Sequence, residues 1–509
     1  MRGLTAATVA DPHPTDLTAR AFAALERRLS PEIAAPVCVA VSGGGDSIAL
    51  LALVCDWAAV RGRRALALSV DHRLQPDSAA WSRFAAETAR SLGAGAQVLA
   101  WTGDKPAAGL AAAARAARHA LLADAAREAG ASVLLMAHTA DDVAEGQVMR
   151  VEGSTLGTLR EWAPSPAWPE GRGVFLLRPL LEASRAELRA FLRDRGLRWI
   201  EDPANADLRS ARARARAVLN PSLSREKEVP ACRSGAEVHA GGRAPVAGAP
   251  GALAQDRLAP AHHSSSRART SGADAPPVRG ALHPSVGREG EGAVALAYSH
   301  IPGGGLMAHR RSLVAADPDP DAARRVLAAA WLCAAGTGRP PRSDSVARLL
   351  ERIAAGEAFA ATLAGARIVA GAATVAFVRD AGEFARRGLQ PLPIPPGTVS
   401  VWDGRFEIAI DEPGWSVVPL AGRMAMLAPA DRDAVRACSP FVRPSLPLLI
   451  GRNEARPVLA TRRARVRPLA LERFQAACGL IAHEAKASVA PEPPATYVGA
   501  LSGFTDPQR

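Results

Sequence analysis

The sequence has no closely spaced cysteine pair, and this absence excludes several kinds of site. Its cysteines are scattered along the chain, and no Cys-x-x-Cys pair occurs. Zinc knuckles, iron–sulfur clusters and persulfide relays need neighbouring cysteines, so none of these is expected. Scattered cysteines are typical of proteins in a reducing cytosol. The six are Cys38, Cys55, Cys232, Cys333, Cys438 and Cys478.

Long apolar segments are absent as well. The longest apolar stretch, Ile48 to Val60, is too short to cross a bilayer and contains Asp56. Residues 1–29 include Asp11, Asp16 and Glu26 and lack the apolar core of a signal peptide. The sequence therefore predicts a cytoplasmic protein that makes no membrane contact.

Lysine is rare, although the chain is strongly basic. Only Lys105, Lys227 and Lys486 occur, whereas Lys and Arg together number 62 against 50 Asp and Glu, which gives a net charge of +12. A coding bias toward arginine explains the rarity of lysine but not the excess of basic residues. That excess favours an anionic partner such as nucleic acid.

Strand and helix patterns alternate along residues 36–218. Helices are expected between the strands, including Ala111–Ala129, and another helix opens at Ser184 with Glu187 completing a capping box. This alternation predicts an α/β fold, a parallel sheet wrapped by helices with ligands at the carboxyl ends of the strands. The predicted strands are Val37–Val41, Ala65–Val70, Gln97–Trp101, Val133–Ala137 and Val174–Leu177.

The composition changes after residue 219. From Asn220 to about Glu291 the chain is rich in Gly, Pro, Ser, His and Arg without periodicity, which is typical of a disordered tract. A linker or a compensated pair of frameshifts would explain this tract, and we favour the second because an ordered domain is expected here. We predict a catalytic domain at 1–218, the low-complexity segment at 219–300, and smaller domains at 301–390 and 391–509.

Ordered patterns return in the C-terminal part. Helical periodicity covers Asp321–Ala335 and Ser343–Ala355, and Ser343 is the expected N-cap of the second helix. A hairpin is predicted within 362–378, and Val401–Ile410 alternates like a single strand. We therefore expect a helical and hairpin domain followed by a small α+β domain.

The run Val37–Ser47 reads VCVAVSGGGDS, an apolar strand that breaks into three glycines and then enters a helix. This arrangement presents consecutive backbone N–H groups at a helix N-terminus, which cradle an anion. The loop has no lysine and carries Asp46 instead. A carboxylate tolerates a polyphosphate only when a divalent cation lies between them. We therefore predict Asp46 beside Mg²⁺ and Ser47 as a phosphate donor; a plain glycine-rich turn is the alternative.

A second polar cluster follows the predicted strand Val133–Ala137. It contains His138, Asp141, Asp142 and Glu145. Asp142 and Glu145 lie three positions apart on a helix and share a face, where they can grip an ammonium or a metal ion. For Asp141 the alternative is stabilisation of the helix N-terminus.

Further polar residues are expected at the same edge of the sheet. Asp71 and His72 directly follow the strand Ala65–Val70, although such a pair is often only a turn. Arg115 and Arg118 lie on the basic helix predicted at Ala111–Ala129.

Two arginine-rich stretches can meet phosphates. In both, a solvated face is the alternative. In the first stretch every second or third residue is an arginine, and on a helix such arginines point to several sides. They therefore contact phosphates on more than one side of the helix, or they are only solvated. The first comprises Arg209, Arg212, Arg214 and Arg216, and the second Arg462, Arg463, Arg465 and Arg467.

In this order, these pieces resemble the tRNA(Ile)-lysidine synthetase family of PP-loop ATP pyrophosphatases. The resemblance is strong over 36–218 and weaker over 320–450. The glycine-loop hexad is shared with other PP-loop enzymes, whereas His-x-x-Asp-Asp-x-x-Glu followed by Asp-Pro-x-Asn and spaced arginines is more specific. Arg73, His119 and Gly146 stand where the family usually has Gly, Tyr and Thr. The motifs are SGGGDS (Ser42–Ser47), SVDHRLQ, AAAARAARHALL, AHTADDVAE, LLRPLL and EDPANADLRSARARAR.

The resemblance implies an ATP-dependent ligase that modifies the wobble cytidine in the CAU anticodon of a minor isoleucine tRNA. ATP would activate carbon 2 of the base as an adenylate and release pyrophosphate. The ε-amine of free lysine would then displace AMP to give lysidine. The implied cofactors are ATP and Mg²⁺, residues 301–390 and 391–509 would recognise the tRNA, and a homodimer is left open.

The resemblance also implies roles for single residues. Which of the arginines at 212, 214 and 216 meets the nucleotide stays open. The catalytic residues implied are Asp46, Asp142, Glu145 and Arg212, with Asp46 at the metal. ATP binding is implied for Ser42, Gly43, Gly44, Gly45, Asp46, Ser47, Asp71, His72 and His138. Contacts to tRNA or phosphate are implied for Arg115, Arg118, Asn205, Arg214 and Arg216.

Other functions compete with this interpretation. A PP-loop thiolase of the 2-thiocytidine type would need paired cysteines, which are absent. An ammonia-using PP-loop ligase would bring a glutaminase domain or partner, and no signature of its nucleophile is evident. A non-catalytic RNA-binding protein that keeps the same fold is the alternative from a different class.

Overall fold

The computed structural model describes residues 16–154, 157–201, 210–219, 298–301, 303–314, 320–338, 341–386, 388–452 and 454–487. Of the predicted low-complexity segment, residues 220–297 lie outside these ranges, and the interpretation of that segment stays a prediction. Within the described ranges, no helix combines the length and the apolar character that a membrane crossing requires.

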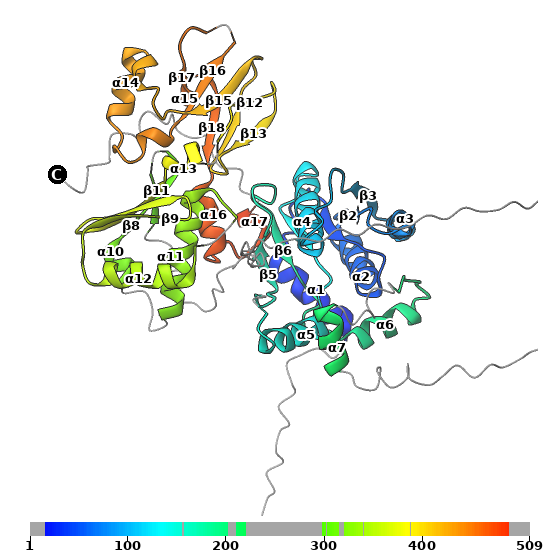
Figure 1. Ribbon diagram of the computed structural model, residues 1–509. Helices are drawn as coiled ribbons and strands as arrows, with labels where there is room; N and C mark the ends of the chain where they lie inside the picture. The colour runs from blue at the N-terminus through cyan, green and yellow to red at the C-terminus, as the bar shows by residue number, and fades with distance from the viewer. Residues whose placement is uncertain are drawn as a thin grey trace, which may run out of the picture.

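The N-terminal part contains a six-stranded sheet in the order β3-β2-β1-β4-β6-β5 (Figure 1). Neighbouring strands are parallel except at one edge, where β5 pairs antiparallel with β6. The predicted α/β fold with a parallel sheet is confirmed, and β5 is an addition that was not predicted. The strands are Val37–Ala40 (β1), Ala65–Asp71 (β2), Gly95–Ala100 (β3), Val133–Leu135 (β4), Trp162–Pro164 (β5) and Phe175–Leu177 (β6).

Helices cover both faces of this sheet. Because side chains alternate along a strand, Val37 and Val39 of β1 pack with α2 on one face, while Cys38 packs with α4 on the other. Ser184 caps α6, and Glu187 completes the predicted capping box. The helices are Leu17–Arg28 (α1), Gly45–Arg61 (α2), Ser78–Ser91 (α3), Leu110–Glu128 (α4), Ala140–Val151 (α5), Arg185–Asp194 (α6) and Ala211–Leu219 (α7).

A five-stranded antiparallel sheet, in the order β7-β8-β11-β10-β9, follows in the chain. It packs with α11 around Trp331 and Phe377. The predicted hairpin is confirmed as part of the meander β9–β10–β11. The prediction that Ser343 is the N-cap of α12 is wrong. Arg342 has the extended backbone conformation of an N-cap, and the helix begins at Ser343. The elements are Tyr298–Ile301 (β7), Gly305–His309 (β8), Arg310–Val314 (α10), Pro320–Ala335 (α11), Ser343–Ala354 (α12), Phe359–Leu363 (β9), Ala366–Ala370 (β10) and Thr374–Arg379 (β11).

Two smaller antiparallel sheets, β12-β15-β16-β17 and β13-β14-β18, complete the C-terminal part. The single strand predicted at 401–410 is wrong, because β13 and β14 form a hairpin that turns at Asp403 and Gly404. Both residues have positive φ, 49° and 62°, a conformation that Asp and Gly tolerate in tight turns. The strands are Leu392–Pro393 (β12), Val399–Trp402 (β13), Phe406–Ala409 (β14), Trp415–Pro419 (β15), Pro447–Gly451 (β16), Val458–Leu459 (β17) and Arg465–Pro468 (β18).

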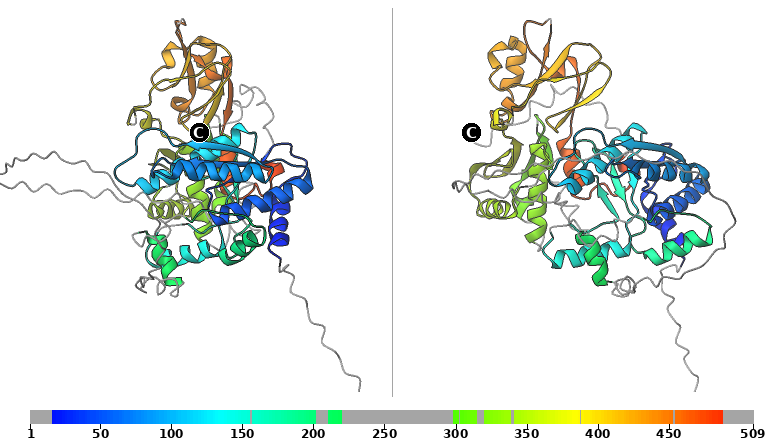
Figure 2. Two further views of the ribbon diagram at one scale, coloured as in Figure 1. Left: turned by 90° about the vertical axis from the view of Figure 1, so that its right-hand side faces the viewer. Right: turned by 45° about the vertical axis from the view of Figure 1, so that its right-hand side comes forward.

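The described chain ends against the N-terminal sheet (Figure 2). Trp162 Nε1 of β5 donates to the carbonyl of Ile481 at 2.6 Å, and Arg28 Nη1 of α1 donates to that of Ala482 at 2.9 Å. The N-terminal layer and the C-terminal sheets therefore lie side by side, with α16 and α17 between them. The remaining helices are Gly382–Arg386 (α13), Pro429–Arg436 (α14), Ala460–Arg463 (α15), Ala470–Ala477 (α16) and Glu484–Ala487 (α17).

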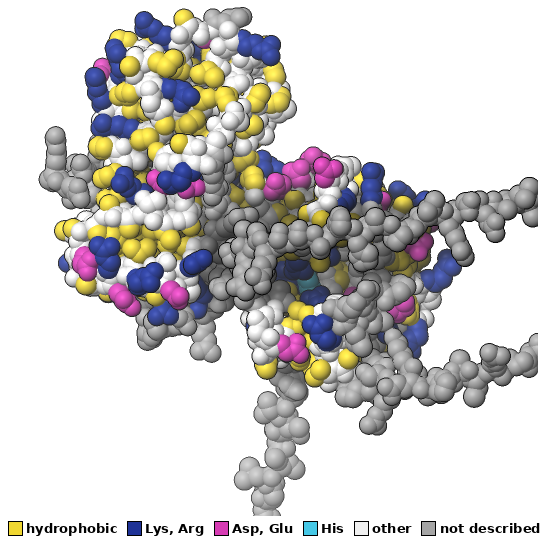
Figure 3. Space-filling view, viewed as in Figure 1, with side chains coloured by type: hydrophobic (Ala, Val, Ile, Leu, Met, Phe, Trp, Pro, Cys, Tyr) yellow, Lys and Arg dark blue, Asp and Glu magenta, His cyan; other side chains and the backbone are white. Residues whose placement is uncertain are grey.

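Each arginine of the C-terminal basic run pairs with an acid. Arg462 Nε, for example, lies 3.0 Å from Asp431 Oδ1. On the face shown in Figure 3, basic side chains are spread among apolar ones and form no single patch. The pairing favours a solvated face over a dedicated phosphate site. The other pairs are Arg463 with Glu412 and Glu454, Arg465 with Asp411, and Arg467 with Glu407 and Glu472.

Candidate active site

The glycine loop joins β1 to α2, as the sequence predicts. Gly43 has a φ of 87°, a left-handed conformation that favours glycine. Gly44 is the N-cap of α2, and no side chain caps this helix end, so its first-turn N–H groups face outward for an anion. Ser47 Oγ donates to the carbonyl of Gly44 at 2.8 Å and accepts a hydrogen bond from the backbone N of Ser42 at 3.2 Å. The two serines therefore brace the loop from both sides.

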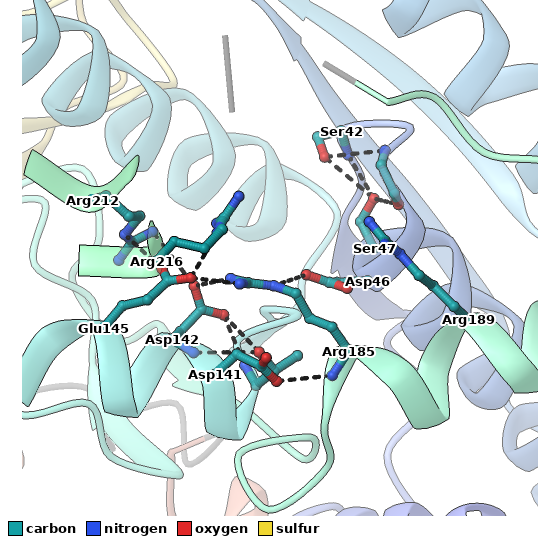
Figure 4. Close-up of polar contacts among 12 residues, drawn as sticks. Ser42, Asp46, Ser47, Asp141, Asp142, Glu145, Arg185, Arg189, Arg212 and Arg216 are labelled. Atoms are coloured by element: carbon teal, nitrogen blue, oxygen red, sulfur yellow. Dashed lines mark hydrogen bonds and ion pairs between the residues drawn. The ribbon is translucent and has the colours of Figure 1, made fainter. Parts of the chain in front are cut away.

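The second cluster lies at the start of α5. Thr139 is the N-cap, and its backbone N donates to Asp142 Oδ2 at 2.9 Å in a capping box. This leaves Asp142 Oδ1 for other partners. Asp142 and Glu145 are 5% and 1% exposed and point to the same side of α5, as predicted from their spacing (Figure 4).

Arg185 joins the two motifs. Its Nε lies 3.3 Å from Asp46 Oδ2, its Nη2 2.9 Å from Asp142 Oδ1, and its Nη1 2.5 Å from Glu145 Oε1 (Figure 4). We call Asp46, Asp142 and Glu145 the three-carboxylate cluster. These residues meet because β1, β4 and β6 are adjacent in the sheet, and α2, α5 and α6 begin beyond the carboxyl ends of these strands.

Two arginines of α7 face the same cluster. Arg216 Nε donates to Glu145 Oε1 at 2.9 Å. Arg212 lies 3.6 Å from both Asp142 Oδ1 and Glu145 Oε2. Arg212 and Arg216 are one helical turn apart, whereas Arg214, between them, is exposed. Three guanidinium groups therefore surround three carboxylates.

The charges in this cluster support one another. Burial raises the pKa of Asp46, the charge of Arg185 counteracts the rise, and the nearby Asp142 adds to it. Burial by itself would lower the pKa of Arg185, but its hydrogen bond to Glu145 and the charges of Asp142 and Asp46 raise it overall. The guanidinium groups thus supply the positive partners that carboxylates away from water need.

One oxygen of Glu145 stands apart. Glu145 Oε2 is buried and accepts no hydrogen bond from any described residue. Its ion-pair contact with Arg212 Nε, at 3.6 Å, is too long for a hydrogen bond. Since buried polar atoms are nearly always hydrogen-bonded, this oxygen is a candidate acceptor for a ligand donor.

His138 lies beside a group of arginines. Its Nδ1 accepts a hydrogen bond from Arg178 Nε at 3.0 Å. Burial, followed by the charges of Arg178 and Arg212, lowers the pKa of His138 to about 2, so the ring is neutral. The pKa of Arg118 is likewise lowered to about 10 by burial and by Arg115. Such crowding of positive charge favours an anion at this place.

Asp71 and His72 lie at the end of β2, on the predicted edge. Asp71 Oδ1 accepts hydrogen bonds from the backbone N of Arg73 at 2.9 Å and from Ser78 Oγ at 2.6 Å. These contacts are those of a turn. His72 packs edge-on against Trp101, with ring centroids 6.2 Å apart, and burial followed by the charge of Arg118 lowers its pKa. A nucleotide role for either residue stays a prediction.

Sequence reasoning missed Arg185 and Arg178. Both lie at or beyond the carboxyl end of β6, where a strand and a capped helix were predicted. That position was the available signal, because it puts the first turn of α6 on the ligand edge of the sheet. The predicted contact Asn205 lies outside the described residues.

Comparison with known proteins extends these observations. Residues 17–223 match the PP-loop domain family. A tRNA(Ile)-lysidine synthase of Caulobacter vibrioides is 45% identical over 473 residues, which cover 91% of this chain and 98% of that protein. A tRNA(Ile)-lysidine synthase of Hyphomonas neptunium is 36% identical over 72% of this chain and 84% of its own length. One of Brucella anthropi is 32% identical over 74% of each chain. The similarity therefore reaches beyond the PP-loop domain into the C-terminal sheets.

Proposed function

The chain belongs to the tRNA(Ile)-lysidine synthase family, and from this premise we propose how its site residues divide the reaction. It is an ATP-dependent ligase that forms lysidine on tRNA(Ile). The observation that carries the proposal is the convergence of Asp46 with Asp142 and Glu145 on one guanidinium. This convergence supports a single site for nucleotide activation and for amine attack.

In the first half-reaction, the oxygen on carbon 2 of the wobble cytidine attacks the α-phosphate of ATP, and pyrophosphate leaves. The uncapped N–H groups of α2 hold the leaving pyrophosphate, and Ser47 donates to it once its hydroxyl turns away from the carbonyl of Gly44. Asp46 would hold Mg²⁺, which would neutralise phosphate charge. The fit is chemical, because Mg²⁺ commonly takes one or two carboxylates together with substrate phosphates. In the described part of the chain, no three or more His, Cys, Asp or Glu residues are grouped so that they could hold a metal ion by themselves.

The arginines near α7 take the charge that develops at the α-phosphate. Arg212 contacts the three-carboxylate cluster at Asp142. Burial lowers the pKa of Arg115 and of Arg118, and the charge of Arg212 lowers both further. An adenylate phosphate would relieve this repulsion, and positioned cations stabilise such a transition state. Arg216 is occupied by Glu145, and Arg214 is exposed, so we assign the nucleotide contact to Arg212.

In the second half-reaction, the ε-amine of free lysine attacks carbon 2, and AMP leaves. Glu145 Oε2, buried and without a hydrogen-bond donor among the described residues, accepts the incoming ammonium together with Asp142. The amine must lose a proton before it attacks, which costs about 4–5 kcal/mol near pH 7 from a free pKa of about 10.4. Glu145 takes this proton first, and the neutral amine then forms the carbon–nitrogen bond as AMP leaves.

The cysteines argue against a thiolase. In the described chain Cys38, Cys55, Cys333, Cys438 and Cys478 take part in no disulfide. Burial raises the pKa of the Cys38 thiol to about 12 and that of Cys55 to about 11, so neither supplies a thiolate at neutral pH. No sulfur relay near the three-carboxylate cluster is available from these residues.

The test is the complete reaction with purified full-length protein. A CAU-anticodon tRNA(Ile) transcript, ATP, Mg²⁺ and L-lysine should yield AMP, pyrophosphate and lysidine, with lysidine identified by mass spectrometry of the digested tRNA. A transcript with a different anticodon is the control and should yield none. Formation of ADP in place of AMP, or transfer of ornithine as readily as lysine, would contradict the proposal.

A further inference from the structure

We propose that Arg185 is a positioning residue that sets the geometry between the nucleotide end and the amine end of the active site. This inference rests on the proposed function, because it gives Arg185 a part in the same reaction. Its three guanidinium nitrogens contact acids from two separate motifs, Asp46 from the glycine loop and Asp142 and Glu145 from α5. A planar fork with fixed donor directions suits such a threefold contact.

Arg185 is itself held in place through its backbone. It is the first residue of α6, directly after the N-cap Ser184, whose side chain forms a capping box with Glu187. The backbone N of Arg185 donates to Asp141 Oδ2 at 2.9 Å. The start of α6 is thereby tied to the start of α5. The guanidinium therefore keeps a defined distance to the carboxylates of α5.

The same helix is anchored to the nucleotide side of the site. Leu188 and Leu192 of α6 are fully buried in the core that contains Ile48 and Leu51 of α2, the helix that begins in the glycine loop. Glu187 pairs with Arg20 of α1. The Arg185 side chain is only 17% exposed, so it has little rotational freedom to lose when substrates bind. Packing and charge together hold Asp46 at a fixed separation from Asp142 and Glu145.

The direction of these contacts determines where the amine enters. Arg185 and Arg216 both donate to Glu145 Oε1, while Oε2 accepts from no described residue. The guanidinium of Arg185 therefore presents Oε2 to the substrate. Without Arg185, the three carboxylates repel one another, and Glu145 keeps only its contacts with Arg216 and Arg212, which do not tie it to Asp46. The adenylated base and the amine acceptor then lose their alignment, which the attack requires.

Replacement of Arg185 by alanine tests this inference in the full-length protein. Lysidine formation by R185A should fall by about 100-fold, as expected for a small misplacement of reacting groups, and the KM for lysine should rise. Guanidinium chloride, added far below concentrations that unfold proteins, should restore part of the rate by filling the vacated place. R185K should not recover the wild-type rate, because one ammonium cannot span three acids.

Arg193 provides the matched control. It lies in the last turn of the same helix, about two turns beyond Arg185, and is exposed. R193A should retain the wild-type rate and should not respond to guanidinium. Near-wild-type activity of R185A, or a loss that guanidinium leaves unchanged while thermal unfolding matches R193A, overturns the inference. Should R185A fail to fold, a wild-type KM for lysine in R185K overturns it instead. A wild-type protein that forms no lysidine overturns the proposed function as well.

Discussion

Arg63 and Glu484 form a buried ion pair across 421 positions of the sequence. Arg63 Nη1 lies 2.7 Å from Glu484 Oε2, and Nη2 lies 3.1 Å from Oε1. Both side chains are 2% exposed. Arg63 Nη1 and Nη2 also donate to the carbonyls of Ser30 and Ala35, whereas its buried Nε has no hydrogen-bond acceptor among the described residues. This contact fixes the end of the described chain against the connection between α2 and β2, and with it the C-terminal sheets relative to the active site.

Replacement of Glu484 by glutamine should lower the free energy of unfolding by about 3–5 kcal/mol, because Arg63 would stay charged and buried without a carboxylate. Denaturant unfolding measures this loss. Glu26 offers a matched control, since its pair with Arg61 is nearly half exposed, and E26Q should change stability by less than about 1 kcal/mol. Equal losses in the free energy of unfolding for E484Q and E26Q would contradict the prediction that the buried pair stabilises the protein more than the exposed one.

Replacement of Asp46 by asparagine should reduce pyrophosphate release by at least about 100-fold, because the metal-side charge at the nucleotide is lost. The affinity for tRNA should stay close to that of the wild type, since Asp46 lies in the glycine loop and not on a basic surface. Pyrophosphate release and filter binding measure the two effects separately. A large loss of tRNA binding would contradict the role assigned to Asp46.

Replacement of Glu145 by glutamine should separate the two half-reactions. The KM for lysine should rise by about 10-fold or more, because the buried acceptor loses its charge. Pyrophosphate release with ATP and tRNA should persist, since the adenylation step does not use this carboxylate. Glu152, exposed at the C-cap of the same helix, is the control, and E152Q should leave both steps unchanged. Equal loss of both half-reactions in E145Q would place Glu145 elsewhere in the mechanism.

The parallel sheet was predictable from sequence because its strands are short apolar runs that end in glycine or polar residues, the pattern of strands buried on both faces. β5 was missed because Trp162–Pro164 is a three-residue edge strand, too short to show a period. The hairpin at 399–409 was read as one strand because alternation continues on both sides of the turn at Asp403. Local patterns thus predict elements but not reversals between them.

In the candidate active site, too, some residues could be predicted from local patterns and others could not. That Asp46, Asp142 and Glu145 lie together was predictable because each belongs to a motif that follows a strand of the same sheet edge; their roles in the reaction stay predictions. Arg185 was not predictable, because its importance comes from the order β1-β4-β6, which brings the starts of α2, α5 and α6 together. Strand order depends on long-range packing, which a local pattern does not reveal.

His119 makes folding stability depend on pH. Its ring is buried on α4, and neither nitrogen has a hydrogen-bond partner among the described residues. Burial, followed by the charges of Arg118 and Arg115, lowers its pKa to about 2. In the unfolded chain the pKa is about 6.5, so below that pH the unfolded state binds a proton that the folded state does not. The free energy of unfolding is therefore unaffected by this histidine above about pH 6.5. As pH falls below that value, the free energy of unfolding decreases by up to about 1.4 kcal/mol per pH unit.

The variant H119F should flatten this dependence between about pH 7 and pH 5, because phenylalanine takes up no proton. His138, whose pKa is also lowered to about 2, should keep part of the slope. Denaturant unfolding across this range measures the slope. The exposed His309 serves as the control, and H309F should leave the slope unchanged. A wild-type slope in H119F would show that His119 is protonated in the folded protein.

Arg73 occupies a backbone conformation that suits glycine. Its φ is 54°, and it lies in the turn after β2, where its backbone N donates to Asp71 Oδ1. The left-handed region costs a residue with a side chain about 1–2 kcal/mol, part of which the greater freedom of glycine in the unfolded chain cancels. Replacement by glycine should therefore raise the free energy of unfolding by up to about 1 kcal/mol. Arg64 is exposed, is absent from the positive-φ residues and precedes β2, so R64G should lower that free energy instead. A loss of stability in R73G equal to that in R64G would show that the Arg73 side chain, and not its strained backbone, governs this turn.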